Sequence, residues 1–217
     1  MCKRHKGVFP GYELATVLPS PRKFYELARY AEEFGLRTCV ESGTWRGDTT
    51  ARLSAELCDR VVTIELSPAH ASAARARFAD DPSVLVLEGD SGALLAGPEF
   101  QPAAMPEPAL FFLDGHWSWG NTALGAAADG GETPILAELA AIFASDHARR
   151  SAIVIDDSRM FLGFDHPGCA ARGASCYPSV RDVAELVCAS RAGPGLRVYV
   201  RRDQIVVVNS NVTIPEW

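Results

Sequence analysis

Two short stretches of this chain carry residue types suited to binding a nucleoside. Residues 40–48 read Val-Glu-Ser-Gly-Thr-Trp-Arg-Gly-Asp, an apolar strand end followed by a turn with glycines at positions 43 and 47. Glycine there lets the backbone approach a ligand closely, because a Cβ would be in the way. Residues 61–65 are a second apolar segment, and it ends on one carboxylate, Glu65. Ligands of open α/β sheets bind beyond the carboxyl ends of the strands, so Glu65 is placed to accept hydrogen bonds from two ribose hydroxyls.

The spacing of the glycines distinguishes between classes of nucleoside cofactor. A dinucleotide fingerprint needs three glycines, as G-x-G-x-x-G. Gly43 and Gly47 are instead spaced G-x-x-x-G, and Glu41 precedes them at the strand end. A carboxylate in that place would repel a pyrophosphate, whereas it suits a sulfonium cation that carries an ammonium group. An ordinary turn between a strand and a helix would also explain one pair of glycines.

With these residues the chain resembles the class I S-adenosylmethionine-dependent methyltransferases, whose first motif is E-x-G-x-x-x-G and whose second ends in an acidic residue. Residues 86–90, Val-Leu-Glu-Gly-Asp, look like the third motif, in which an acidic residue faces the adenine. The resemblance implies an S-adenosylmethionine site whose cofactor-binding residues are Glu41, Gly43, Thr44, Gly47, Glu65, Asp90 and Ser91.

A second group of reactive side chains follows two later apolar segments. Asp114 ends the segment 109–113, and Asp156 with Asp157 ends the segment 152–155. If these strands are neighbours, the three carboxylates meet at the edge that holds the cofactor. Carboxylates brought together need a cation or a shared proton, and oxygen ligands suit Mg²⁺. The alternative is that Asp156 and Asp157 only anchor a loop, because adjacent residues of a strand point to opposite faces.

The three aspartates also resemble the metal site of the macrocin (TylF-type) O-methyltransferases. In those enzymes an aspartate after strand four and an acidic pair after strand five bind Mg²⁺. The resemblance implies that the metal ligands in this chain are Asp114, Asp156 and Asp157. His116 and Asp114 are the expected catalytic residues, with His116 as the base, because an imidazole can take a proton from a hydroxyl whose pKa a metal has lowered. His166 is its competitor, and His116 could instead bond a backbone carbonyl or ligate the metal.

Helical and extended segments alternate along the chain. Helices are expected at residues 21–34, 48–57, 68–78 and 179–189, and strands at 38–41, 60–65, 84–87, 109–113, 152–155, 197–200 and 204–208. A further helix is capped by Thr133, has Pro134 at its first position, and turns Leu136, Leu139, Ala140 and Phe143 inward. The first five strands are apolar without alternation, as in parallel strands covered on both faces. The short link at 201–203 requires an antiparallel hairpin.

We therefore expect an α/β fold, a single Rossmann-like doubly wound domain. Its seven-stranded sheet is mostly parallel, with an antiparallel C-terminal hairpin. The domain is expected to span residues 1–217, with an N-terminal helical extension at about 1–35.

Composition limits the partners and the compartment. The 217 residues carry a formal charge of −6, which argues against nucleic acid as a partner, since phosphate binding needs a basic face. No apolar run approaches the length of a membrane span, and no signal-peptide pattern follows the basic start. The cytoplasm is the expected compartment.

The six cysteines form no C-x-x-C pair, so free thiols are expected, with Cys39 and Cys58 acting as small hydrophobes.

These features predict an S-adenosylmethionine-dependent O-methyltransferase that acts on a hydroxyl of a sugar or another small natural product, with assistance from Mg²⁺. One alternative is a metal-independent N-methyltransferase. Another is a nucleoside-binding protein of the same fold without catalysis. The expected partner is a small-molecule acceptor, with neither nucleic acid nor membrane, and a homodimer is one possible assembly.

Overall fold

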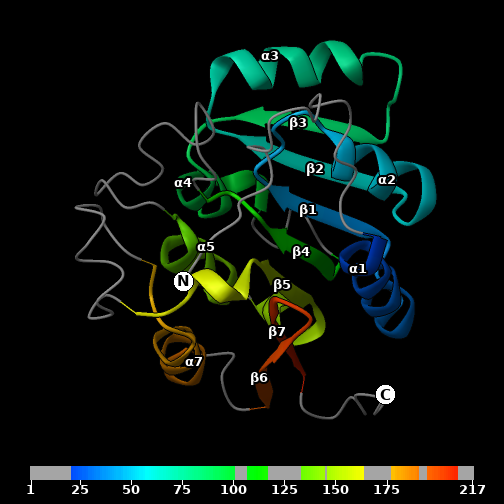
Figure 1. Cartoon of the computed structure of the whole chain (residues 1–217). Coiled ribbons are helices and arrows are strands. Elements are labelled where there is room, and N and C mark those ends of the chain that lie inside the picture. Colours follow the sequence, from blue (N-terminus) through cyan, green and yellow to red (C-terminus); the bar gives the residue numbers. More distant parts are fainter. Residues whose placement is uncertain are drawn as a thin grey trace, which may run out of the picture.

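The computed structural model describes residues 21–100, 107–116, 133–144, 146–163, 177–190 and 195–209. Within them one sheet has the strand order β3-β2-β1-β4-β5-β7-β6 (Figure 1). Its strands are β1 (Thr38–Ser42), β2 (Arg60–Glu65), β3 (Val84–Glu88), β4 (Ala109–Leu113), β5 (Ala152–Asp156), β6 (Leu196–Arg201) and β7 (Gln204–Asn209). The strands β1 to β5 pair in parallel, whereas β7 runs antiparallel to β5 and β6 antiparallel to β7. The predicted doubly wound sheet with a C-terminal hairpin is confirmed.

Helices cover both faces of this sheet. They are α1 (Pro21–Phe34), α2 (Asp48–Glu56), α3 (Pro68–Arg77), α4 (Ser91–Leu95), α5 (Ile135–Phe143) and α7 (Val180–Ala189). One core joins α1 and α2 to the sheet, and the other joins α4, α5 and α7 to the opposite face (Figure 1). This two-sided burial explains why β4 and β5 are almost entirely apolar, and why every residue of β1 is buried although Thr38, Glu41 and Ser42 are polar. Among the described residues, no helix has both the length and the apolar character that a membrane span requires.

The helix after β4 begins later and faces the core differently than the sequence pattern predicted. Pro134 is the N-cap residue of α5, and the Thr133 hydroxyl accepts a bond of 3.4 Å from the backbone N–H of Ile135. The expected inward position Ala140 is exposed, and Leu136 is only partly buried. The buried face instead consists of Ile135, Glu138, Leu139, Ile142 and Phe143. The prediction is correct for Leu139 and Phe143, but it missed Ile135, Glu138 and Ile142, since a carboxylate is not expected among apolar residues.

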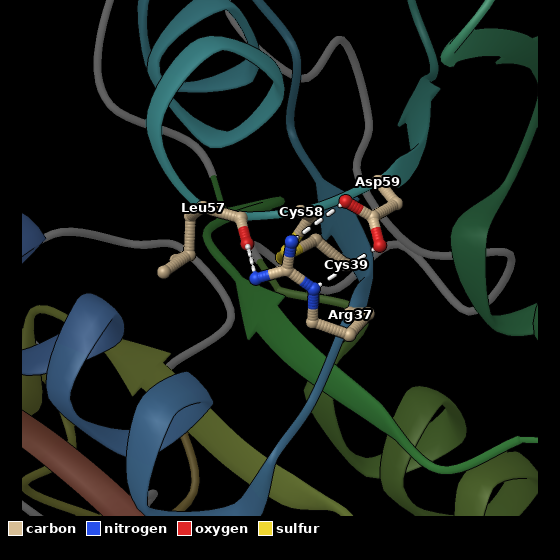
Figure 2. The surroundings of a disulfide bond; sticks show 5 residues. All are labelled: Arg37, Cys39, Leu57, Cys58 and Asp59. Atoms are coloured by element: carbon tan, nitrogen blue, oxygen red, sulfur yellow. Dashed lines mark hydrogen bonds and ion pairs between the residues drawn. A yellow bond between two sulfur atoms is a disulfide. The ribbon is translucent and has the colours of Figure 1, made fainter.

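Cys39 and Cys58 form a disulfide, so the prediction of free thiols is wrong for this pair. Figure 2 shows the bridge between β1 and the segment that leads into β2, with the guanidinium of Arg37 beside it. Arg37 binds the Asp59 carboxylate with two nitrogens, at 3.1 and 2.8 Å, and the carbonyl oxygen of Leu57 at 3.4 Å. The sequence could not reveal the pair, because Cys39 comes near the residues that precede β2 only when β1 and β2 pair. Of the other cysteines, the described part of the chain contains Cys188, which is exposed and free.

Reducing this disulfide should lower the free energy of unfolding by about 3 kcal/mol, the loop-closure entropy expected for a short loop. The bridge closes a loop between positions 19 residues apart. Denaturant unfolding with and without reductant measures the difference. In the Cys39→Ala/Cys58→Ala double variant the reductant should have no such effect, and an equal loss in that variant would contradict the assignment to this bridge.

Candidate functional site

The turn between β1 and α2 depends on two glycines in left-handed conformations. Gly43 has φ +86°, and a Cβ built on it would lie 2.4 Å from the carbonyl oxygen of Asp114. Gly47 is the N-cap residue of α2 with φ +76°, and a Cβ there would lie 2.8 Å from the Phe78 ring. Both glycines are therefore required by the turn itself, and Gly43 lets the turn pack directly on the carboxyl end of β4.

Glu65 lies at the carboxyl end of β2, where the sequence predicted a ribose-binding carboxylate. One of its oxygens accepts a hydrogen bond of 2.7 Å from the backbone N–H of Trp45, and the other accepts one of 2.8 Å from that of Ser67. The two bonds fix the plane of the carboxylate beside the glycine turn. Each carboxylate oxygen retains a lone pair for a further donor, so a diol can bind across both.

Glu41 is 1% exposed and turns inward from β1. Its Oε2 accepts hydrogen bonds from the hydroxyls of Thr50, at 2.5 Å, and Thr63, at 2.7 Å. The Thr63 hydroxyl also lies 2.6 Å from that of Thr44. Burial raises the pKa of Glu41 to about 7, although these hydrogen bonds oppose the shift. In this structure Glu41 ties α2 and β2 together behind the turn, and its contact with a cofactor stays a prediction.

Asp90 and Ser91 start the short helix α4, which the sequence did not predict. Asp90 caps this helix by accepting a 2.8 Å bond from the backbone N–H of Ala93. The Ser91 hydroxyl donates a 2.6 Å bond to Glu138 of α5, whose side chain is 1% exposed. Burial raises the pKa of Glu138. Sequence reasoning missed Glu138, yet its spacing from Ile135 and Ile142 places it on the same helix face.

The structure brings three of the predicted catalytic and metal-binding residues together. The imidazole of His116 lies between two aspartates, with Nδ1 3.3 Å from Asp114 and Nε2 3.3 Å from Asp157. Its ring is buried and meets Tyr177 edge-on, with centroids 5.8 Å apart. The side chain of Asp114 is 34% exposed, which leaves it the more accessible member of the His116–Asp114 pair. The convergence of these residues at the carboxyl ends of β4 and β5 was predicted correctly.

The two aspartates after β5 face cations of the protein itself. Lys23 of α1 places its Nζ 2.6 Å from an oxygen of Asp156 and 2.6 Å from one of Asp157. Arg159 binds both oxygens of Asp157, each at 2.7 Å, and also pairs with Asp203. Asp157 has φ +58°, so the chain has already left the strand conformation there. This backbone turn lets two adjacent carboxylates reach the same ammonium group.

The charges of this cluster shift several pKa values. Burial alone would lower the pKa of His116, but the hydrogen bond to Asp157 and the neighbouring carboxylates raise it above its usual value. Burial would raise the pKa of Asp157, yet His116, Arg159 and Lys23 hold it well below its usual range. Desolvation and the charge of Asp156 raise the pKa of Asp114. As the pH rises, the carboxyl group of Asp114 therefore loses its proton at a higher pH than an ordinary aspartate. The imidazole of His116 likewise keeps its positive charge to a higher pH than an ordinary histidine.

The predicted magnesium site is not found among the described residues, where no group of three or more His, Cys, Asp and Glu side chains is arranged to hold a metal ion. The residues present do not fit Mg²⁺, because the Lys23 ammonium already stands between Asp156 and Asp157. Sequence reasoning missed Lys23 since it lies in the first helix, far from every motif. His166 lies outside the described residues.

Solved structures share this arrangement of strands and helices. The O-methyltransferase TomG from Streptomyces achromogenes, involved in tomaymycin synthesis and solved with SAM, is 21% identical, with a TM-score of 0.52 over 87% of this chain and 79% of that one. The chain has the α/β fold of these solved methyltransferases. An O-methyltransferase from Bacillus cereus in complex with SAH is also 21% identical, with a TM-score of 0.53 over 88% and 83%. SAH-bound PaMTH1 from Podospora anserina is 16% identical, with a TM-score of 0.55 over 88% and 79%.

No protein-family model matches the chain, and no curated protein sequence matches it. At these identities the solved structures establish the methyltransferase fold of the chain. Its cofactor and its acceptor have to be argued from its own residues.

Proposed function

We propose that this protein is an S-adenosylmethionine-dependent methyltransferase that acts on a hydroxyl of a small molecule. The observation that carries the proposal is the carboxylate of Glu65, which two backbone amides hold beside the Gly43 turn. A negative charge fixed there suits the ribose diol of a nucleoside. Similar folds bind this cofactor, since TomG was solved with SAM and the Bacillus cereus enzyme with SAH. TomG also acts in the synthesis of a natural product, which supports a small-molecule acceptor.

Asp114 and His116 are the proposed catalytic pair. Asp114 is partly exposed and its pKa is raised, as suits a group that takes up a proton near neutral pH. Both ring nitrogens of His116 face carboxylates, so we assign the imidazole to holding Asp114 in place. In the proposed reaction the acceptor oxygen attacks the methyl carbon, the bond from that carbon to sulfur breaks, and the hydroxyl proton passes to Asp114. Holding both reactants in line supplies much of the rate.

No step of this proposal passes through a metal ion, because Lys23 occupies the place between Asp156 and Asp157. The same observation supports a second candidate, N-methylation, since a neutral amine acceptor needs no metal to activate it. The two candidates differ in their acceptors. Mass spectrometry of products from paired hydroxyl and amine substrates would separate them.

Cofactor binding is the direct test of the proposed function. Titration calorimetry should show S-adenosylmethionine binding to the wild type, and Glu65→Gln should weaken it about tenfold, the loss of one charge-assisted interaction. Glu56→Gln is the control, because Glu56 is an exposed glutamate at the end of α2 that pairs with Arg52 and lies in none of the motifs. Its affinity should equal that of the wild type. Tight binding of NAD without any response to S-adenosylmethionine would refute the proposal.

A further inference from the structure

We propose that the ammonium group of Lys23 is the built-in cation of this site, standing where a divalent metal would otherwise bind Asp156 and Asp157. The inference rests on the proposed function, because it describes how the acceptor side of that site is organised. Lys23 is then a positioning residue that acts through the two aspartates.

The contacts of Lys23 are those of a bound cation. Its side chain is 12% exposed, and its Nζ lies 2.6 Å from one oxygen of Asp156 and 2.6 Å from one of Asp157. Asp203, in the turn between β6 and β7, places a third carboxylate 3.7 Å from the same nitrogen. An ammonium group has three donors and no acceptor, so carboxylates on three sides match its chemistry.

A divalent ion and this ammonium group exclude each other. Mg²⁺ binds carboxylate oxygens at about 2.0–2.1 Å, so an ion held by Asp156 and Asp157 would lie close to Nζ and be repelled by it. Arg159 further reduces the room for a metal, because it binds both oxygens of Asp157 at 2.7 Å. The two aspartates after β5 thus already face two cations of the protein, the largely buried ammonium of Lys23 and the guanidinium of Arg159, whose side chain is 42% exposed.

The fold holds Lys23 in place through the helix that carries it. Glu26, three residues later in α1 and buried, pairs with Arg202 at 2.9 Å and with Arg201 at 3.3 Å. Farther along α1, the hydroxyl of Tyr30 lies 3.0 Å from that of Tyr199 in β6. These contacts anchor α1 to the β6–β7 hairpin. These contacts hold the backbone of Lys23 in place. Its ammonium group can make room for a metal only by giving up its contacts with the three carboxylates.

The consequence for the site is a fixed chain of contacts from α1 to the catalytic pair. Lys23 holds Asp157, Asp157 lies 3.3 Å from Nε2 of His116, and Nδ1 of His116 lies 3.3 Å from Asp114. The charge that a metal would contribute is supplied by a side chain of the protein.

Manganese binding by the full chain tests this inference, with Mn²⁺ as an electron-paramagnetic-resonance probe of a magnesium-type site. The wild type should not reduce the free Mn²⁺ signal at up to about 1 mM, the weak end of the range for protein sites of hard cations. Lys23→Ala should bind about one equivalent, because it leaves the aspartates without their ammonium. Lys23→Arg keeps the charge and should behave as the wild type. Adding Asp156→Asn to Lys23→Ala should remove the new binding.

Each result supports or overturns the inference. Binding of Mn²⁺ by the wild type that Asp156→Asn abolishes would overturn it, and so would a folded Lys23→Ala variant that binds no Mn²⁺. Circular dichroism reports folding, and Lys23→Gln, which keeps most of the stem, replaces Lys23→Ala if that variant does not fold. Calorimetry with S-adenosylmethionine on the same samples separates the two proposals. A wild type that binds S-adenosylmethionine and also binds Mn²⁺ through Asp156 refutes only the inference, whereas one that binds neither refutes only the proposed function.

Discussion

Gly43→Ala is expected to abolish S-adenosylmethionine binding and to lower the free energy of unfolding by about 2–4 kcal/mol, the combined cost of a left-handed residue with a Cβ and of overpacking. The φ of +86° disfavours any side chain at this position. The added Cβ would also lie 2.4 Å from the carbonyl oxygen of Asp114, which is backbone and cannot rotate away. The turn must therefore shift off the end of β4, and the amide of Trp45 that holds Glu65 moves with it.

Gly35→Ala separates the steric clash from the backbone strain. Gly35 follows α1 with φ +63°, and nothing lies within 4 Å of a Cβ built on it. This variant should lose about 1 kcal/mol, the strain of one left-handed residue, and should bind the cofactor as the wild type does. Denaturant unfolding and calorimetry measure both quantities. Equal effects of the two variants on cofactor binding would contradict the role assigned to the Gly43 turn.

Asp114→Asn should lower the rate of methyl transfer by about 10²–10⁴, the usual contribution of a positioned proton acceptor. The amide preserves the shape of the side chain but cannot accept the proton. Formation of S-adenosylhomocysteine with a hydroxyl acceptor measures the rate. Asp59→Asn is the control, because Asp59 is an exposed aspartate that pairs with Arg37 away from the site. That variant should retain the wild-type rate.

The pH dependence of the wild-type rate tests the same assignment. A base works only after losing its proton, and the pKa of Asp114 is raised above its usual value. The rate should therefore be low at pH values below that raised pKa and should rise as the pH passes through it. Asp114→Asn should lose this pH-dependent rise. If His116→Ala loses all activity while Asp114→Asn keeps it, the imidazole is the base, as the sequence alone had suggested.

The sequence by itself determined the sheet and the position of the candidate site in it. Every strand was predicted to within two residues at each end. Runs of apolar residues, and the residues that end a strand, can be recognised from the local sequence alone. Gly43, Gly47 and Glu65 were identified for the same reason, since a turn and a strand end depend on neighbouring residues. The meeting of Asp114 with Asp157 also followed, because the carboxyl ends of parallel neighbours share one edge of the sheet.

The tertiary structure alone decided what balances the charges of that site. Lys23 and Asp157 are 134 positions apart, and no motif relates them. Their contact exists because α1 packs against β4 and β5, and such packing depends on surfaces built from residues far apart in the sequence. The pairing of Cys39 with Cys58 and the burial of Glu138 in α5 were decided in the same way. Local patterns predict elements, whereas the partner of a buried charge depends on which elements pack together.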